Sequence, residues 1–254
     1  MIDIHCHILP GLDDGAANTN DSLEMARQAV SQGITQIVAT PHHKNGSFDN
    51  NLQSIVTEVN LLNKELAREG IDLNILPGQE VRLYGEMVED LDIDLLTVNN
   101  SGVYLLVEFP SSHLPRYANK LLFDLQLKGI VPIIVHPERN REIMENPSKL
   151  YQLIKEGALS QVTASSVTGS MGKKIKKFSL DLLSHNLAHF IASDSHNTTT
   201  RPFELRQAYE TVEYELGMEI RYLLQENPEE MIKGKMIDKE IPERIKKKKV
   251  LGLF

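Results

Sequence analysis

Short apolar runs rich in β-branched residues alternate with longer amphipathic runs along most of the chain. This alternation is typical of β/α units that build a parallel sheet. The seven strand-like runs cover residues 1–5, 34–40, 73–81, 103–109, 130–136, 159–166 and 188–194. The helix-like runs cover residues 21–33, 51–70, 116–129, 146–157 and 173–186. The sequence therefore predicts one α/β domain over residues 1–254, a seven-stranded barrel-like fold with a helical C-terminal extension from about residue 203.

The ends of the predicted helices carry the expected capping residues. Several helix-like runs end in glycine, and the run over residues 173–186 ends in Asn186. Both residue types suit the left-handed conformation at the C-terminal end of a helix. Asp21, and Asn146 followed by Pro147, are predicted helix starts.

Charge and composition narrow the class of protein. A net charge of -8 argues against a protein that binds nucleic acid, which would normally carry a basic surface. The chain has a single cysteine, no leader-like start and no apolar run long enough to cross a bilayer. We therefore expect a protein of the reducing cytoplasm.

The first strand carries two histidines, His5 and His7. Alternate side chains of a strand share a face, so these two imidazoles point together while Cys6 points the other way. Imidazole is the most common metal-binding side chain in proteins, and the pair is suited to bind one cation. Asp194 and His196 repeat this spacing at the end of the last predicted strand.

Further acidic and imidazole side chains lie at or just after the ends of other predicted strands. The carboxyl ends of parallel strands meet at one rim, where active sites of α/β barrels form. The nine candidate metal ligands at this rim are His5, His7, Asp14, His42, Glu80, Glu108, His136, Asp194 and His196.

The number of these donors exceeds the needs of one metal ion, because a tetrahedral zinc site uses only three or four. Two or three ions are therefore predicted, with Glu80 able to bridge neighbours. Mixed imidazole and carboxylate donors suit manganese, iron or zinc. Closely spaced cations activate water for in-line displacement at phosphorus.

Two arginines lie in loops that leave the same strands. Arg139 follows His136, and Arg201 follows His196. A guanidinium matches phosphate through two parallel hydrogen bonds, so both arginines are candidate catalytic residues that contact a phosphoryl group. The alternative for Arg139 is an ion pair with Glu138 or Glu142.

The segments "DIHCHILPGLDDGA", "TPHH", "PGQE", "EFP", "HPERN" and "ASDSH" resemble, in order and spacing, the motifs of the polymerase-and-histidinol-phosphatase (PHP) superfamily. The match is closest to its bacterial tyrosine-protein phosphatases of capsule and exopolysaccharide operons, and it covers nearly the whole chain. The resemblance implies a distorted seven-stranded (β/α)7 barrel and a three-metal site, usually described with manganese. It further implies dephosphorylation of phosphotyrosine on a bacterial tyrosine kinase, whose C-terminal tyrosine cluster is the expected partner.

The same resemblance implies how the metals are shared. His5, His7, Glu80 and Asp194 would hold one ion; Glu80, Glu108 and His136 a second; and Asp14, His42 and His196 a third.

Other readings remain open from the sequence. Many tyrosine phosphatases use a cysteine thiolate with an arginine six positions later, but position 12 is Leu12, so Cys6 is predicted to be a small buried residue. Another phosphoesterase of the superfamily, such as a histidinol-phosphate phosphatase or a nuclease, and a regulator that binds phosphotyrosine without hydrolysis are the alternatives. The basic tail of residues 240–254 would give at most weak, peripheral membrane contact.

Overall fold

The computed structural model describes residues 1–91 and 93–246. Its strands are β1 (Ile2–Cys6), β2 (Gln36–Ala39), β3 (His42–His43), β4 (Asn74–Pro77), β5 (Glu80–Arg82), β6 (Tyr104–Glu108), β7 (Val131–Val135), β8 (Leu159–Thr163) and β9 (Phe190–Ala192). Its α-helices are α1 (Thr19–Ser31), α2 (Leu52–Arg68), α3 (Ala118–Leu127), α4 (Arg141–Glu145), α5 (Ser148–Lys155), α6 (Ala164–Thr168), α7 (Lys173–Ser184), α8 (Leu205–Leu216) and α9 (Met218–Met231). Two 3-10 turns, η1 (Val98–Asn100) and η2 (Pro137–Arg139), complete the described elements.

All strand pairs are parallel, as the sequence predicts, and they form two sheets. One sheet has the order β1-β2-β4 and the other the order β3-β5-β6-β7-β8-β9. The predicted strand over residues 73–81 is split at the same place as its partner: β4 ends with Pro77 opposite Ala39 of β2, and β5 begins with Glu80 opposite His42 of β3. The prediction of seven strands is therefore corrected to nine in two sheets.

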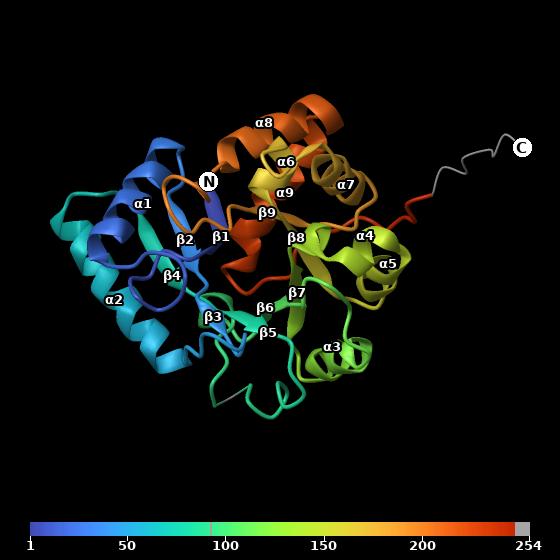
Figure 1. Cartoon of the computed structure of the whole chain (residues 1–254), viewed down its shortest axis with the longest axis horizontal. Coiled ribbons are helices and arrows are strands. Elements are labelled where there is room, and N and C mark those ends of the chain that lie inside the picture. Colours follow the sequence, from blue (N-terminus) through green and yellow to red (C-terminus); the bar gives the residue numbers. More distant parts are fainter. Residues whose placement is uncertain (92, 247–254) are drawn as a thin grey trace, which may run out of the picture.

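The two sheets meet at β1 and the segment after β9, where Asp194 N donates to His5 O and His7 N donates to Ser195 O, both at 2.9 Å. An isolated parallel bridge joins Cys6 at the end of β1 to Ser195 beyond β9. Closure into a barrel is not confirmed by this pairing, although the strands surround the centre of the molecule with most of the helices outside them (Figure 1).

Two groups of buried apolar side chains hold these layers together. The inner group lies among the strands and includes Ile4, Leu106, Ile133 and Phe190, together with Met231 at the end of α9. The larger outer group packs the other faces of the strands against the helices. Burial of apolar area is the main contribution to stability, so the inner group stabilises the strands that carry the polar residues at their carboxyl ends.

The helix ends agree closely with the capping signals. Gly33, Gly70, Gly129 and Gly157 follow α1, α2, α3 and α5 with φ values of 82°, 66°, 84° and 108°, a region that favours glycine. The start of α1 differs from the prediction: Asn18, and not Asp21, is the N-cap, and its side chain accepts from the backbone N–H groups of residues 20 and 21. Residues 164–166, predicted as the end of a strand, begin α6 instead.

The predicted helical extension is confirmed by α8 and α9, which pack together after residue 203. The basic tail lies partly outside the described residues, from position 247 onward. Its described part approaches the domain at Arg244, whose Cζ lies 4.2 Å from the centre of the Tyr151 ring. None of the described helices is long and apolar enough to span a bilayer.

Candidate metal centre

The predicted ligands lie at or just beyond the carboxyl ends of several strands. His5 lies near the end of β1 and Glu108 ends β6. His42 and Glu80 lie beyond the ends of β2 and β4, as the first residues of the short strands β3 and β5. His136 follows β7 and Asp194 follows β9, with φ values of 36° and 52°. Such left-handed backbone costs a residue other than glycine about 1 kcal/mol or more, and it is common where a side chain must be aimed into a site.

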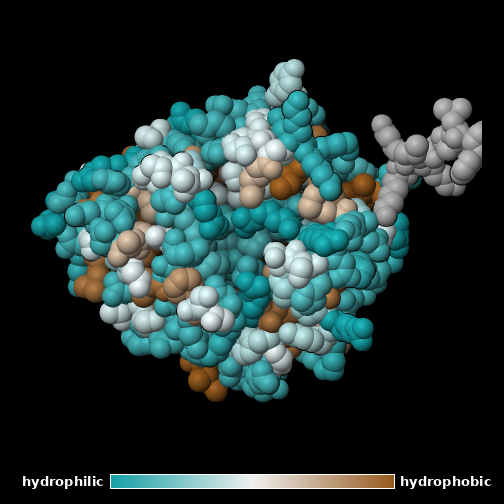
Figure 2. All heavy atoms as spheres, viewed as in Figure 1, coloured by the Kyte–Doolittle hydropathy of each residue, from teal (hydrophilic) through white to brown (hydrophobic). Residues whose placement is uncertain are grey.

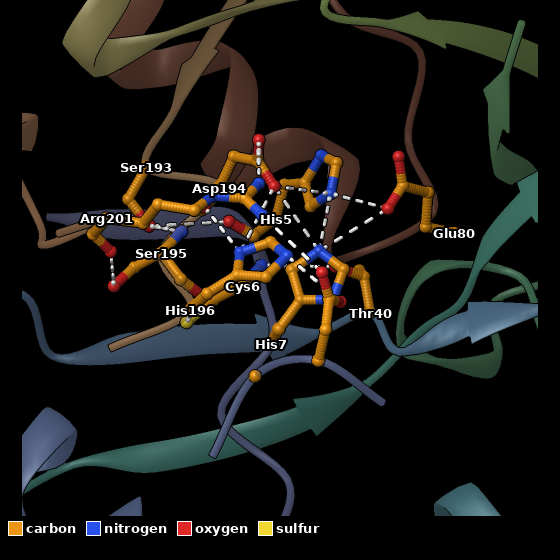
Figure 3. Close-up of polar contacts among 12 residues, drawn as sticks. His5, Cys6, His7, Thr40, Glu80, Ser193, Asp194, Ser195, His196 and Arg201 are labelled. Carbon is orange, nitrogen blue, oxygen red and sulfur yellow. Dashed lines mark hydrogen bonds and ion pairs between the residues drawn. The ribbon is translucent and has the colours of Figure 1, made fainter. Parts of the chain in front are cut away.

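Glu80 lies at the centre of the cluster and is fully buried. Its Oε2 atom is 3.3 Å from His5 Nε2, 3.4 Å from His7 Nε2 and 2.9 Å from His42 Nδ1. Its Oε1 atom lies 2.8 Å from His136 Nε2, within hydrogen-bonding distance. Figure 3 shows the rings of His5 and His7 turned toward Glu80 and Asp194.

The strand alternation predicted for His5 and His7 is confirmed. Their Nε2 atoms are 3.3 Å apart, and Asp194 Oδ1 lies 3.5 Å from one and 3.3 Å from the other. Cys6 between them is buried on the other side, where its Sγ atom is 3.5 Å from the Ser195 carbonyl oxygen.

The donor atoms fall into three overlapping groups, each compact enough for one ion. These groups are His5, His7 and Glu80; His42, Glu80 and Glu108; and His7, Asp14, His42 and His196. The first group holds His5, His7 and Glu80 of the set that the resemblance implies, but not Asp194. The third holds Asp14, His42 and His196 as implied, together with His7. In the second group His42 lies within reach of Glu80 and Glu108, while His136 contacts Glu80 from the far side.

The cluster fits divalent cations by its unpaired donor atoms. Glu80 Oε2, His42 Nδ1 and His196 Nε2 are buried and have no hydrogen-bond partner among the described residues. Orphaned buried polar atoms are costly, and a cation would satisfy them together. The mixture of imidazoles and carboxylates is the donor set of manganese, iron or zinc.

Electrostatics in the cluster favour ionised carboxylates. Burial alone would raise the pKa of Glu80, but His5, His136 and His42 hold it well below its usual range. Burial likewise opposes ionisation of Asp194, and Arg139 and His5 outweigh it, so that this pKa is also lowered. Contacts with His196 and His42 lower the pKa of Asp14.

The remaining donors have shifts of both signs. Burial, and then the charge of Glu80, raise the pKa of Glu108 to about 7. Burial and the Arg139 charge lower the pKa of His136 to about 4, and burial with the His7 charge lowers that of His196 to about 4. These two imidazoles are therefore neutral at neutral pH, the form that binds a metal.

Two positioning residues were missed by the sequence reasoning. Asp13 Oδ2 lies 2.6 Å from His7 Nδ1, and Gln161 Oε1 lies 3.0 Å from His5 Nδ1. Each oxygen accepts the Nδ1 proton and leaves Nε2 free to face the cluster, an arrangement that also fixes the ring. The only signal for Asp13 was its place beside Asp14, and for Gln161 its inward register in a buried strand.

The two candidate phosphate-binding arginines meet at the same carboxylate. Arg139 Nη2 and Arg201 Nη2 donate to Asp194 Oδ2 at 2.7 and 3.0 Å. The alternative partners do not pair with Arg139: Glu138 accepts from Thr163 N and Ser166 Oγ, and Glu142 pairs with Lys149. The arginines therefore also help to hold Asp194.

A cavity of about 280 Å³ gives access to the cluster. Its walls include His42, Glu80, Glu108, Arg139 and Arg201. Figure 2 shows the same face of the molecule hollowed near its centre and ringed mainly by hydrophilic residues. His43, the neighbour of His42, is buried, and its Nδ1 atom lies 3.0 Å from Asp49 Oδ1.

Comparison with known proteins assigns the family. The profile described as capsular polysaccharide synthesis, CpsB/CapC, matches residues 1–233. The chain belongs to the CpsB/CapC family. Tyrosine-protein phosphatase YwqE of Bacillus subtilis is 51% identical over the full length of both chains. Tyrosine-protein phosphatase CpsB of Streptococcus pneumoniae is 31% identical over 93% of this chain and all of its own.

Solved structures agree with this CpsB/CapC assignment. A structure from work on YwqE of B. subtilis and CpsB of S. pneumoniae, described as metal-dependent tyrosine phosphatases, matches with a TM-score of 0.95 at 52% identity. It covers 97% of this chain and 100% of that chain. A histidinol phosphate phosphatase from Lactococcus lactis is only 14% identical with a TM-score of 0.56, covering 86% of this chain and 95% of its own, and shares the fold alone.

Proposed function

We propose that this chain is a metal-dependent protein-tyrosine phosphatase that acts on a bacterial tyrosine kinase and its substrates in capsule synthesis. The observation that supports it most is the convergence of imidazoles and carboxylates on Glu80 beside two arginines. The capsule-synthesis family and the relatives named as tyrosine phosphatases agree with this proposal. We further propose manganese as the ion, with the nine predicted ligands sharing two or three of them.

The proposed chemistry divides into cation-dependent and protein-dependent parts. Divalent cations in such a cluster supply charge neutralisation at phosphate and activation of water. Glu80, Asp194 and Asp14 contribute the negative charge that would retain the cations, and the neutral His136 and His196 contribute nitrogen donors.

The arginines are proposed to bind the phosphoryl oxygens. Each directs one guanidinium nitrogen to Asp194, and both side chains line the cavity. A guanidinium has five N–H donors, so it can hold Asp194 and still donate to phosphate. The departing phenolate has an unperturbed pKa of about 10, so a strong general acid is not required.

Phosphate release by metal-stripped protein, reloaded with single divalent ions, tests this function. We expect hydrolysis of a phosphotyrosine peptide to return with manganese and to exceed hydrolysis of histidinol phosphate or DNA. Preference for histidinol phosphate would instead support the related phosphatase activity. Tight binding of phosphotyrosine without phosphate release would support a regulatory protein.

Alanine variants test the arginine assignment separately. Arg139→Ala and Arg201→Ala should lower turnover at least about tenfold, since charge-assisted hydrogen bonds contribute about 1.5–3 kcal/mol. Because both arginines also hold Asp194, metal content must be measured on the same preparations. Wild-type efficiency in both variants would contradict phosphate binding by these residues.

A further inference from the structure

A second, larger depression lies directly beside the candidate metal centre. We define the flanking groove as the depression of about 920 Å³ whose walls include His113, Arg116, Tyr117, Glu142 and Lys149. One wall is the loop between β6 and α3, and the other is formed by α4 and α5.

Both walls of the flanking groove continue from the walls of the metal-centre cavity. Phe109 and Ser111 line the cavity, and Pro110 with the residues from His113 onward line the groove. On the opposite wall, Asn140 lines the cavity and Glu142 lines the groove. The cavity and the groove are therefore lined by neighbouring residues of the same two segments.

Hydrogen bonds hold the two walls together. The Asn140 side-chain amide donates to the carbonyl oxygens of Pro110 at 2.8 Å and His113 at 3.1 Å. Glu142 Oε2 accepts from Leu114 N at 2.6 Å, and Arg141 N donates to Ser111 O at 2.8 Å. These bonds make the groove a preformed feature, which lowers the entropy cost of binding.

The charge of the groove is opposite to that of the whole chain. The protein has a net charge of -8, yet the groove walls carry Arg116 and Lys149 against the single acid Glu142. Glu142 is already paired with Lys149 and with the Leu114 backbone N–H. Arg116 is exposed and is not among the arginines paired with a carboxylate in the described part of the chain.

We propose that the flanking groove binds an acidic stretch of the substrate polypeptide, supplied by aspartate or glutamate side chains near the phosphotyrosine, with Arg116 as its main electrostatic contact. This proposal rests on the proposed phosphatase function and adds to it a residue that determines substrate preference. Extended chain advances about 3.3 Å per residue, so acidic residues within about five positions of the phosphotyrosine lie within reach of an adjacent groove. Arg116 acts on peptide binding and not on the reacting phosphate.

Two phosphotyrosine peptides test the proposal on the metal-loaded protein. One carries aspartate and glutamate at the five positions on each side of the phosphotyrosine, and the other carries serine and glycine there. In Arg116→Ala we expect KM for the acidic peptide to rise about 3- to 10-fold, which is the size of effect that loss of an exposed charge contact gives. In Arg116→Glu the rise should be larger, because the new carboxylate repels the acidic peptide. Turnover at saturation, and hydrolysis of p-nitrophenyl phosphate and of the neutral peptide, should stay within about twofold.

Arg68→Ala is the matched control, because it removes the same charge from α2 on the opposite side of the molecule (Figure 1). Its kinetics should equal those of the wild type. The preference of the wild type for the acidic peptide should also decrease with salt, since the contact is exposed.

The outcomes separate the groove from the phosphatase function. Equal KM values of the wild type for the two peptides, or an unchanged preference in Arg116→Glu, would overturn the groove proposal while leaving the phosphatase intact. Failure of the metal-loaded wild type to hydrolyse either peptide or p-nitrophenyl phosphate would instead overturn the proposed function.

Discussion

Asp13 offers a graded test of how the metal centre is held together. Its carboxylate lies 2.6 Å from His7 Nδ1, and neither side chain is exposed to solvent. The contact keeps the Nδ1 proton on the outer side of the ring, so that Nε2 can bind a cation. The same carboxylate accepts from Gly15 N at 2.9 Å and from His42 N at 3.1 Å, and thus positions a second candidate ligand.

The expected magnitudes follow from the charge of this hydrogen bond. Asp13→Ala removes this charge-assisted hydrogen bond, which contributes about 1.5–3 kcal/mol. If that free energy is lost from metal binding, the affinity for manganese should fall by about 10- to 150-fold. Asp13→Asn keeps a neutral acceptor and should lose only about 5- to 10-fold. Isothermal titration calorimetry of manganese into the metal-stripped variants measures both affinities.

Asp124→Ala in α3 is the matched control, because its carboxylate pairs only with Lys120 at the surface of the described structure. Circular dichroism melts of the metal-free variants separate loss of fold from loss of affinity. Wild-type manganese affinity in both folded Asp13 variants would refute the argument that this carboxylate sets the His7 tautomer.

Further predictions address the thiol, the loop and acid stability. Cys6→Ser should leave phosphate release within a few-fold of wild type, because Cys6 is fully buried away from the cluster, whereas a loss of several orders of magnitude in folded protein would revive a thiolate mechanism. Gly15→Ala should lower the melting temperature and metal content, since a Cβ there would lie 2.0 Å from the His7 carbonyl oxygen, and an unchanged melt would contradict this close approach. Burial lowers the pKa of His189 to about 3, so the unfolded chain takes up a proton first, and stability is lost as pH falls below about 6.5. Urea unfolding of the wild type should show that the free energy of unfolding falls by about 2 kcal/mol between neutral pH and pH 5 because of His189. His189→Gln should remove this fall, and the control His113→Gln, at an exposed position, should keep it. Equal pH dependence in the wild type and both variants would exclude His189 as the cause.

Much of the fold and the candidate ligands could be predicted because both depend on short-range periodicity. Strand runs end where the chain becomes polar, and parallel strands bring those ends together, which is why His5, His42, Glu80 and Asp194 meet. The glycines after the helices were equally readable, since positive φ depends on the residue itself.

Contacts between distant segments could not be predicted in the same way. The interruption between β4 and β5 lies opposite the interruption between β2 and β3, which is a pairing of segments 38 positions apart. Asn18 and Asp21 are both good capping residues, so the residue types alone do not decide which of them caps α1. The pairing of Gln161 with His5 joins residues 156 positions apart, and the shared contact of Arg139 and Arg201 with Asp194 likewise depends on loop conformation.

The most direct test of a cation-dependent phosphatase centre is paired measurement of metal content and phosphotyrosine hydrolysis in wild type and Glu80→Gln. Glu80 contacts His5, His7, His42 and His136, so the loss of its charge should lower manganese content and turnover together. The exposed Glu89→Gln serves as the control and should keep both. Wild-type turnover in Glu80→Gln protein that elemental analysis shows to be free of metal would contradict the proposed function.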